Sequence, residues 1–248
     1  RIMDFKVTSL SGDPHLKVFR EERERSVMLC VDKGSHMNFG TRGTFKSIQA
    51  ARAAALLGWA ANHQHDRVGG VLFADPHQES SYFRATKDRR ALWRLLRALT
   101  SEPETAANPT PEELPDILLK ASRGIGTGGL VFVIADFNQP LEGLKRALSQ
   151  LAQHHSVVLV PIDDPADFDL PDMGEVMFRD ASGELLSVNT SNEQGRQHYR
   201  QAWEKRRAVL QQAANSLGIA VIPVQTNQDV HMALMHGLER RLRMRAWL

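Results

Sequence analysis

Two aspartates stand directly after short apolar runs, and their placement indicates a shared site. Asp32 closes the run Ser-Val-Met-Leu-Cys-Val-Asp, and Asp136 closes the run Gly-Leu-Val-Phe-Val-Ile-Ala-Asp. Continuous runs of Val, Leu and Ile are typical of strands buried on both faces of a parallel sheet. Side chains just beyond such strands lie at the carboxyl edge, where open α/β sheets bind their ligands. The two carboxylates could therefore share one cation.

The loop after Asp32 supplies the other candidate ligands. Residues 32–41 read Asp-Lys-Gly-Ser-His-Met-Asn-Phe-Gly-Thr and lead into a helical pattern from about Phe45 to His63. A strand, an acid, a small polar loop and a helix resemble the first metal-adhesion motif, Asp-x-Ser-x-Ser, of von Willebrand factor A domains. Gly34 and His36 stand at its two serine positions, so the motif is degenerate.

The predicted metal site consists of Asp32 and Asp136, with His36 and Thr86 as weaker candidate ligands. Mg²⁺ is the candidate cofactor, because this hard cation prefers oxygen ligands. Imidazole suits it poorly. The alternative needs no metal, because acids at a sheet edge also cap helices and accept hydrogen bonds from backbone amides. The sequence leaves both interpretations open.

Several segments resemble the bacterial family called domain of unknown function 58. The N-terminal matches are Asp-Phe-Lys-Val-Thr-Ser at residues 4–9 and Pro-His-Leu-Lys-Val-Phe-Arg-Glu-Glu at residues 14–22. Further matches are Met-Asn-Phe-Gly at 37–40, Phe-Lys-Ser at 45–47 and Asp-Arg-Val-Gly at 66–69. Phe5 stands where the family usually has Trp.

The resemblance implies a von Willebrand factor A-like fold and a non-enzymatic adaptor role. Members of the family typically occur alongside MoxR-type AAA+ ATPases, and the implied role is to link the motor to a client protein during assembly or maturation. We therefore expect a MoxR-type ATPase and a client as partners. The expected docking surface consists of residues close to the two acids: Asp32, Lys33, Ser35, His36, Asp136 and Asn138.

Composition excludes several other classes of protein. The chain has 248 residues and a formal net charge of +2, which disfavours both disorder and a nucleic-acid partner. Cys30 is the one cysteine, so no intrachain disulfide is possible. The most apolar helical stretch, residues 50–61, falls short of the ~20 residues of a membrane span. These features predict a cytoplasmic protein without a membrane span in this chain.

Apolar strand patterns alternate with helical patterns along the chain. The sequence predicts a charged outer strand at residues 15–25, a turn at 75–77, a linker at 100–111, a hairpin whose turn is at 181–184 and a last strand at 219–224. Thr44 is the expected cap of the helix that starts near Phe45.

The alternation of strand and helix patterns predicts an α/β fold with a parallel-dominated, Rossmann-like sheet and helices on both faces. We expect an N-terminal extended segment at residues 1–25 and one von Willebrand factor A-like domain at residues 26–248. The chain begins with Arg1 rather than Met, so we also expect a preceding segment, and the question of a membrane anchor there stays open.

One enzymatic alternative competes with the adaptor hypothesis. Acids at the carboxyl ends of parallel strands also serve metal-dependent phosphodiesterases and nucleases, which use cations to activate water. Such sites cluster three or four acids, and Asp75 and Asp163 are the available additions to the pair. The glycines at residues 124–129 precede a strand, whereas a phosphate-binding loop follows one, so a nucleotide site is not predicted there.

Overall fold

The computed structural model describes residues 2–3, 16–17, 25–74, 79–101, 114–138, 143–179 and 184–246. The predicted turn at residues 75–77, most of the predicted linker at residues 100–111 and the tip of the predicted hairpin lie outside these ranges. So does most of the predicted outer strand at residues 15–25. Within that N-terminal stretch, β1 (Ile2–Met3) pairs antiparallel with β2 (Leu16–Lys17).

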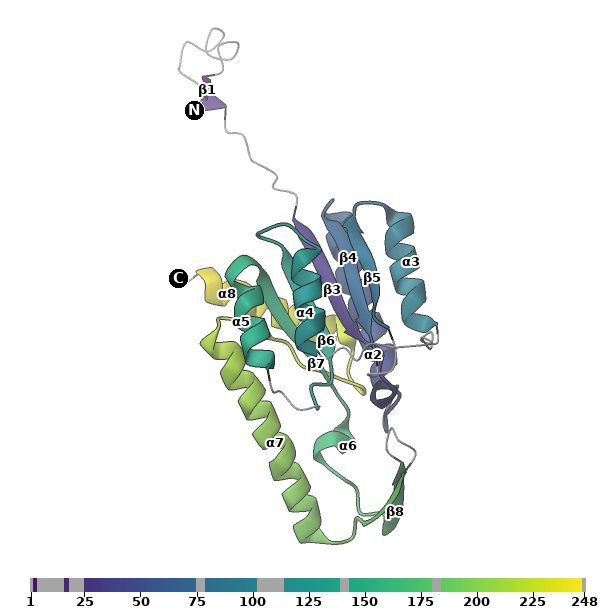
Figure 1. The fold of residues 1–248 in the computed structure, drawn as a ribbon. Helices are drawn as coiled ribbons and strands as arrows, with labels where there is room; N and C mark the ends of the chain where they lie inside the picture. The colour runs from purple at the N-terminus through teal and green to yellow at the C-terminus, as the bar shows by residue number, and fades with distance from the viewer. Residues whose placement is uncertain are drawn as a thin grey trace.

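A mostly parallel sheet forms the centre of the molecule (Figure 1). The strand order is β10-β7-β6-β3-β4-β5, and β11 also pairs with β7. Only the edge strand β5 runs antiparallel, against β4. The bounds are β3 (Ser26–Asp32), β4 (Arg67–Phe73), β5 (Ser81–Thr86), β6 (Leu130–Ala135), β7 (Ser156–Asp163), β10 (Ala220–Val221) and β11 (Val224–Gln225).

The two strands that carry the acids are expected to be adjacent or nearly adjacent, and they are direct neighbours. β3 pairs parallel with β6 in a register that sets Val27 opposite Leu130 and Val31 opposite Ile134. From β3 the chain continues to β4 on one side and later returns to β6 on the other side. The strand order therefore reverses between β3 and β6, and such a switch point is where open α/β sheets form a crevice.

Helices cover both faces of the sheet, and the strand side chains alternate between two apolar cores. Met28 and Cys30 face the layer of α4, α5 and α7, whereas Leu29 and Val31 face the layer of α2, α3 and α8. This two-sided burial explains why the strand sequences are continuously apolar. The bounds are α2 (Lys46–His63), α3 (Arg89–Thr100), α4 (Leu114–Arg123), α5 (Leu144–His154), α7 (Glu193–Ser216) and α8 (Val230–Ala246).

Helix α2 packs closely on the sheet because small residues face it. Ala50, Ala53 and Ala54 are fully or almost fully buried. A Thr44 cap is predicted from the sequence, but the helix is preceded by Phe45 and has no side-chain cap. The Lys46 amide instead donates to the carbonyl of Phe39, so the preceding loop satisfies one of the amides at the helix start.

Two features at the C-terminal side of β7 depart from prediction. The short helix α6 (Pro165–Phe168) follows β7 directly and is not predicted. The predicted last strand at residues 219–224 is interrupted, and its two halves, β10 and β11, both pair with β7. Pro223 lies in the interruption and has no amide hydrogen to donate to a ladder.

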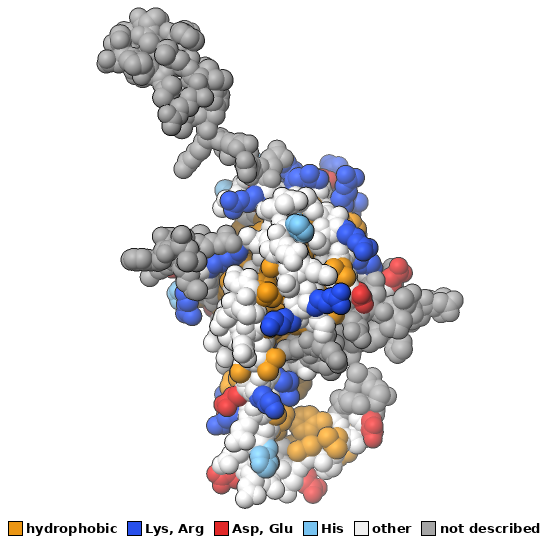
Figure 2. All heavy atoms as spheres, turned by 60° about the vertical axis from the view of Figure 1, so that its left-hand side comes forward, with side chains coloured by type: hydrophobic (Ala, Val, Ile, Leu, Met, Phe, Trp, Pro, Cys, Tyr) orange, Lys and Arg blue, Asp and Glu red, His pale blue; other side chains and the backbone are white. Residues whose placement is uncertain are grey.

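The predicted hairpin is confirmed. It consists of β8 (Glu175–Arg179) and β9 (Leu185–Asn189), which pair antiparallel. Helix α7 runs past the sheet toward this hairpin (Figure 1). Hydrophobic side chains gather at the lower end of the view in Figure 2, the end at which Figure 1 places β8. Leu186 and Met177 of the hairpin are 64% and 58% exposed.

Candidate functional site

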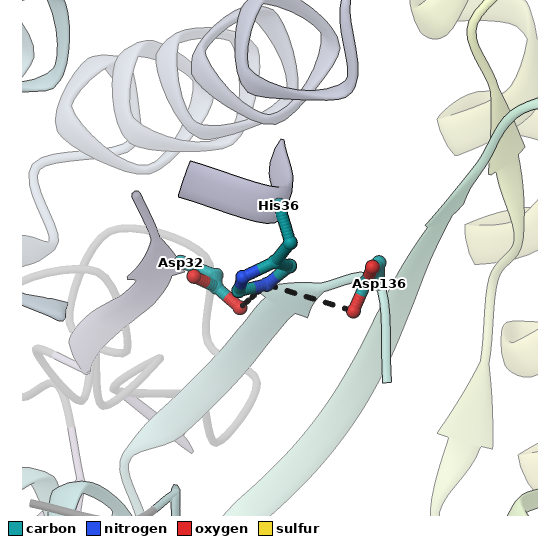
Figure 3. A group of neighbouring side chains, drawn as sticks. All are labelled: Asp32, His36 and Asp136. Carbon is teal, nitrogen blue, oxygen red and sulfur yellow. Dashed lines mark hydrogen bonds and ion pairs between the residues drawn. The ribbon is translucent and has the colours of Figure 1, made fainter. Parts of the chain in front are cut away.

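The carboxylates of Asp32 and Asp136 converge at the switch point, with the His36 ring beside them (Figure 3). Asp32 ends β3, Asp136 follows β6, and His36 lies on the short 3-10 helix η1 (Ser35–Met37). The His36 Nε2 atom is 3.0 Å from Asp32 Oδ2 and 3.7 Å from Asp136 Oδ1. The structure thus brings together three of the four predicted ligands.

Both aspartates also bind amides of the turns that follow them. Asp32 Oδ1 accepts from the Gly34 amide at 2.8 Å. Asp136 Oδ1 accepts from the Asn138 amide at 3.0 Å, and its Oδ2 accepts from the Asn138 side-chain nitrogen at 3.2 Å. The alternative that needs no metal is therefore correct in one respect, because both acids accept hydrogen bonds from backbone amides. It is wrong for helix capping, because η1 and α2, which follow Asp32, and α5, which follows Asp136, have no side-chain caps.

A buried lysine neutralises this edge, and sequence reasoning missed it. Lys46 is 2% exposed, and its ammonium lies 3.4 Å from Asp136 Oδ2 and 2.7 Å from Asp167 Oδ2. Its Nζ also lies 5.5 Å from the Phe39 ring centroid, within cation–π range. A helical signal was available, because Lys46 shares one face of α2 with the buried Ala50, Ala53 and Leu57 at spacings of four, three and four.

The end of β7 adds three more acids to the same edge. Asp163 binds the guanidinium of Arg207, which also donates to the Asp136 carbonyl at 2.6 Å. Asp164 and Asp167 form a capping box on α6. Sequence reasoning named Asp163 only as a possible extra acid and missed the other two, because a four-residue helix leaves no periodic pattern to detect.

Asp164 joins three segments that are far apart in the sequence. Its Oδ1 accepts from the Thr41 hydroxyl at 2.5 Å and from the Ala166 amide at 2.9 Å. Its Oδ2 accepts from the Thr226 hydroxyl at 2.5 Å and from the Thr41 amide at 2.9 Å. The residue is completely buried. These bonds fix the loop before α2 and the turn after β11 to the end of β7.

Burial and hydrogen bonding shift the pKa values of the edge acids in opposite directions. Burial raises the pKa of Asp32 against the opposing hydrogen bond and charge of His36. Burial likewise raises the pKa of Asp163 against the opposing charge of Arg207. Burial also acts to raise the pKa of Asp164, but hydrogen bonds from Thr226, Thr41 and Ala166 together outweigh it and hold that pKa below its ordinary value.

Two predicted site residues have other places in the structure. The Lys33 ammonium donates to the carbonyls of Ala98 and Ser101 at 2.5 and 2.7 Å, so it binds the C-terminal end of α3 instead of pointing to a partner acid. Burial lowers its pKa. Thr86 lies opposite Val68, at the amino end of β4, because β5 runs antiparallel. Thr86 therefore lies at the amino ends of the parallel strands, whereas the two acids lie at their carboxyl ends.

The remaining docking candidates lie at the carboxyl edge. Ser35 is exposed, and His36 and Asn138 are partly exposed. Asp75, the further acid of the enzymatic alternative, lies outside the described residues.

The donor set at the switch point does not suit Mg²⁺. One ligand atom from each of Asp32, His36 and Asp136 lies within 4.8 Å of the others. Mg²⁺ requires near-octahedral oxygen ligands, whereas a set with imidazole suits transition metals. Gly34 offers no side-chain oxygen, and the Lys46 ammonium already lies beside Asp136.

We predict that Mg²⁺ produces no saturable heat in titration calorimetry at millimolar concentration. The double variant Gly34→Ser and His36→Ser restores both hydroxyls of the motif and removes the imidazole from the acids. It should therefore bind Mg²⁺ measurably more tightly than the natural chain. Micromolar affinity in the natural chain, lost in Asp32→Ala, would contradict this reading of the site.

Comparison with known proteins places the chain in a family. The family model described as "Protein of unknown function DUF58" matches residues 1–209. The chain belongs to the DUF58 family. Among its relatives is the uncharacterized protein Mb1516 of Mycobacterium bovis, 25% identical over 229 residues, which are 92% of this chain and 71% of that protein. An uncharacterized protein of Mycobacterium avium, MAV169, is 30% identical over 101 residues, 41% of this chain and 59% of that protein.

Solved structures of similar fold extend the comparison. An aerotolerance-related membrane protein from Bacteroides fragilis superposes with a TM-score of 0.54 at 18% identity, covering 87% of this chain and 99% of that chain. A von Willebrand factor type A protein from Catenulispora acidiphila matches with a TM-score of 0.47 at 13% identity, covering 88% and 42%. The predicted α/β architecture, a mostly parallel sheet with helices on both faces, is confirmed and resembles the fold of the Bacteroides fragilis protein. Across the described residues of the DUF58 chain, no helix has the length and apolarity to cross a membrane.

Proposed function

We propose that this DUF58 chain is a protein-interaction domain that docks a MoxR-type AAA+ ATPase at the carboxyl edge of its sheet. In this role it is an adaptor for the assembly or maturation of a client protein. One observation carries the interaction role: the acids of the edge are bound by donors from the protein itself. The choice of ATPase comes from the family resemblance.

The bonding of the acids favours an interaction surface over a hydrolytic centre. Among the described residues, each aspartate of the edge accepts from at least one protein donor. Lys46 and Arg207 supply buried or mostly buried positive charge. A metal-dependent phosphodiesterase instead needs carboxylates that are free to hold cations with an open position for water. The acids concerned are Asp32, Asp136, Asp163, Asp164 and Asp167.

The same bonds give the edge a fixed shape. Asp32 holds the turn at Gly34, Asp136 holds the turn at Asn138, and Asp164 holds Thr41. A partner that binds preformed loops loses less conformational entropy than one that must order them. Ser35 is exposed on these loops, and His36 and Asn138 are partly exposed, so a partner can contact all three residues.

A bulky cation on the exposed edge should block docking without affecting the fold. We expect Ser35→Arg to weaken binding to a purified MoxR-type ATPase by about tenfold or more, since an interface centre tolerates little intrusion. Biolayer interferometry measures the dissociation constant, and a melting curve checks the fold.

Ser216→Arg is the matched control. Ser216 is also exposed, but it ends α7 near the start of β10, at the amino edge of the sheet. This variant should bind as the natural chain does. Equal affinity of Ser35→Arg and the natural chain would contradict docking at the carboxyl edge.

A further inference from the structure

A groove between α2 and α3 is a second binding surface, and we propose that it takes an amphipathic, acidic helix of a partner protein. The groove has a volume of about 640 Å³ and is lined by the first half of α2, the C-terminal end of α3 and the end of β3. Asp32, Lys33 and Asn38 of the carboxyl edge line one end of the groove. The groove still goes beyond the proposed function, because its apolar walls are faces of α2 and α3 and it is independent of the identity of the ATPase.

The walls of the groove carry large apolar side chains that remain partly in water. Phe45 is 48% exposed and Ile48 is 43% exposed, one helical turn apart at the start of α2. Leu96 and Leu99, also one turn apart, line the groove from α3 and are partly buried. Two pairs of apolar residues at helical spacing on facing helices can contact the apolar stripe of a third helix.

The charge around the groove has one sign. No Asp or Glu occurs from residue 33 to residue 65 or from residue 89 to residue 101. Arg52 lines the groove and is exposed. Asp32 lines one end but is 6% exposed and bonded to His36. The complementary ligand therefore carries acidic residues beside its apolar stripe.

The shape and lining favour a helix over a membrane or a nucleic acid. A membrane surface requires apolar side chains that project outward, whereas Ile48, Leu96 and Leu99 line a concave groove. Nucleic acid requires cations spaced along the path of its phosphates. Of the basic residues that line the groove, Lys33 binds the carbonyls of α3, which leaves Arg52.

A second possible occupant belongs to the chain itself. The residues that follow Ser101 include Glu102 and Glu104, so their charge also complements the groove. The test must therefore separate a partner helix from this acidic segment.

The test measures binding of a synthetic helix to the full chain by fluorescence anisotropy. The probe is a labelled peptide of about 18 residues, or five turns, with a Leu stripe and Glu on its other faces. The matched peptide carries Lys in place of Glu. We expect the Glu peptide to bind with a micromolar dissociation constant and the Lys peptide to bind at least about tenfold more weakly.

Variants locate the bound peptide. Ile48→Glu places an acid on the apolar wall and should weaken binding of the Glu peptide by about tenfold or more. Val209→Glu is the matched control, because Val209 is 49% exposed on α7, on the opposite face of the sheet. Its affinity should equal that of the natural chain. Ser35→Arg should keep peptide binding, so failure of ATPase docking and failure of the groove proposal are distinguishable.

Five results would overturn the proposal. The first three are absence of peptide binding, equal affinity for the Glu and Lys peptides, and equal affinity of Ile48→Glu and Val209→Glu. The fourth is Ile48-dependent binding to phosphatidylglycerol vesicles but not to the Glu peptide, which would assign the surface to a membrane. A further variant, in which a Gly-Ser linker replaces residues 102–113, tests whether the acidic segment after Ser101 occupies the groove. Peptide binding that appears only in that variant would make the acidic segment the natural occupant and would likewise overturn the proposal.

Discussion

Replacing Lys46 by methionine is expected to destabilise the protein by about 3–5 kcal/mol, because it leaves buried carboxylates without their counter-charge. Lys46 is 2% exposed, and its two partners Asp136 and Asp167 are 3% and 7% exposed. Methionine keeps most of the length of the side chain and removes only the ammonium. The loss therefore reports the uncompensated charge rather than a cavity.

Chemical denaturation followed by circular dichroism measures this loss. The single thiol gives an independent readout, because Cys30 is completely buried and burial raises its pKa to about 12, so that labelling requires opening of the core. Lys145→Met, at an exposed lysine of α5, is the matched control and should change stability by less than about 0.5 kcal/mol. Adding Asp167→Asn to Lys46→Met should recover part of the loss. A loss below about 1 kcal/mol in Lys46→Met would contradict a charge-compensated edge.

Replacing Asp164 by alanine is expected to cost about 2–4 kcal/mol, since it removes the acceptor of several buried or partly buried donors at once. The donors are the hydroxyl and amide of Thr41, the hydroxyl of Thr226 and the amide of Ala166. Asp164→Asn keeps the shape but exchanges one acceptor oxygen for a donor and should cost about half as much. Asp169→Ala, at an acid whose side chain is 61% exposed, is the control and should have little effect.

Asp164 should also make the free energy of unfolding depend on pH, and the direction of its shifted pKa sets the sign of this dependence. Because the folded pKa of Asp164 is lower than the ordinary value of about 3.9, its carboxylate stabilises the fold above that pH. This stabilisation is lost as the pH falls through the folded pKa. Asp32 and Asp163 have raised pKa values, so their burial costs stability at neutral pH and that cost is relieved on protonation.

Acid unfolding separates the contribution of Asp164 from these opposing ones. The unfolding free energy of the natural chain should fall more steeply below about pH 4 than that of Asp164→Asn. Parallel pH profiles of the two proteins would contradict the role given to Asp164.

The sequence was sufficient for the position of the acid pair but not for its chemistry. The short apolar runs before Asp32 and Asp136 indicated strands buried on both faces, and neighbouring parallel strands end at one edge. The direction of β5 could not be predicted from a short run, which is why Thr86 was assigned to the wrong edge. Hydrophobic periodicity also does not predict which basic side chain forms an ion pair with a buried acid. Lys46 lies 90 residues from Asp136 in the chain, and only the packing of α2 brings them together.

Lys33 shows a second limit of sequence reasoning. Lys33 was predicted to belong to the surface that docks a partner, whereas in the structure its ammonium donates to carbonyls at the C-terminal end of α3. The carbonyls at a helix end lack partners within the helix and favour a cation. Since α3 begins more than fifty residues later in the chain, no local pattern connects the two.

The most direct test of the central claim is the affinity of the natural chain for a nucleotide-free MoxR-type ATPase, measured by interferometry with and without a chelator. Because the edge acids are compensated by Lys46, Arg207 and His36, docking should not depend on a bridging divalent cation. We expect saturable binding with the same dissociation constant in EDTA and in Mg²⁺, and loss of this binding in Ser35→Arg. Binding that EDTA abolishes, or no binding in either buffer, would contradict it.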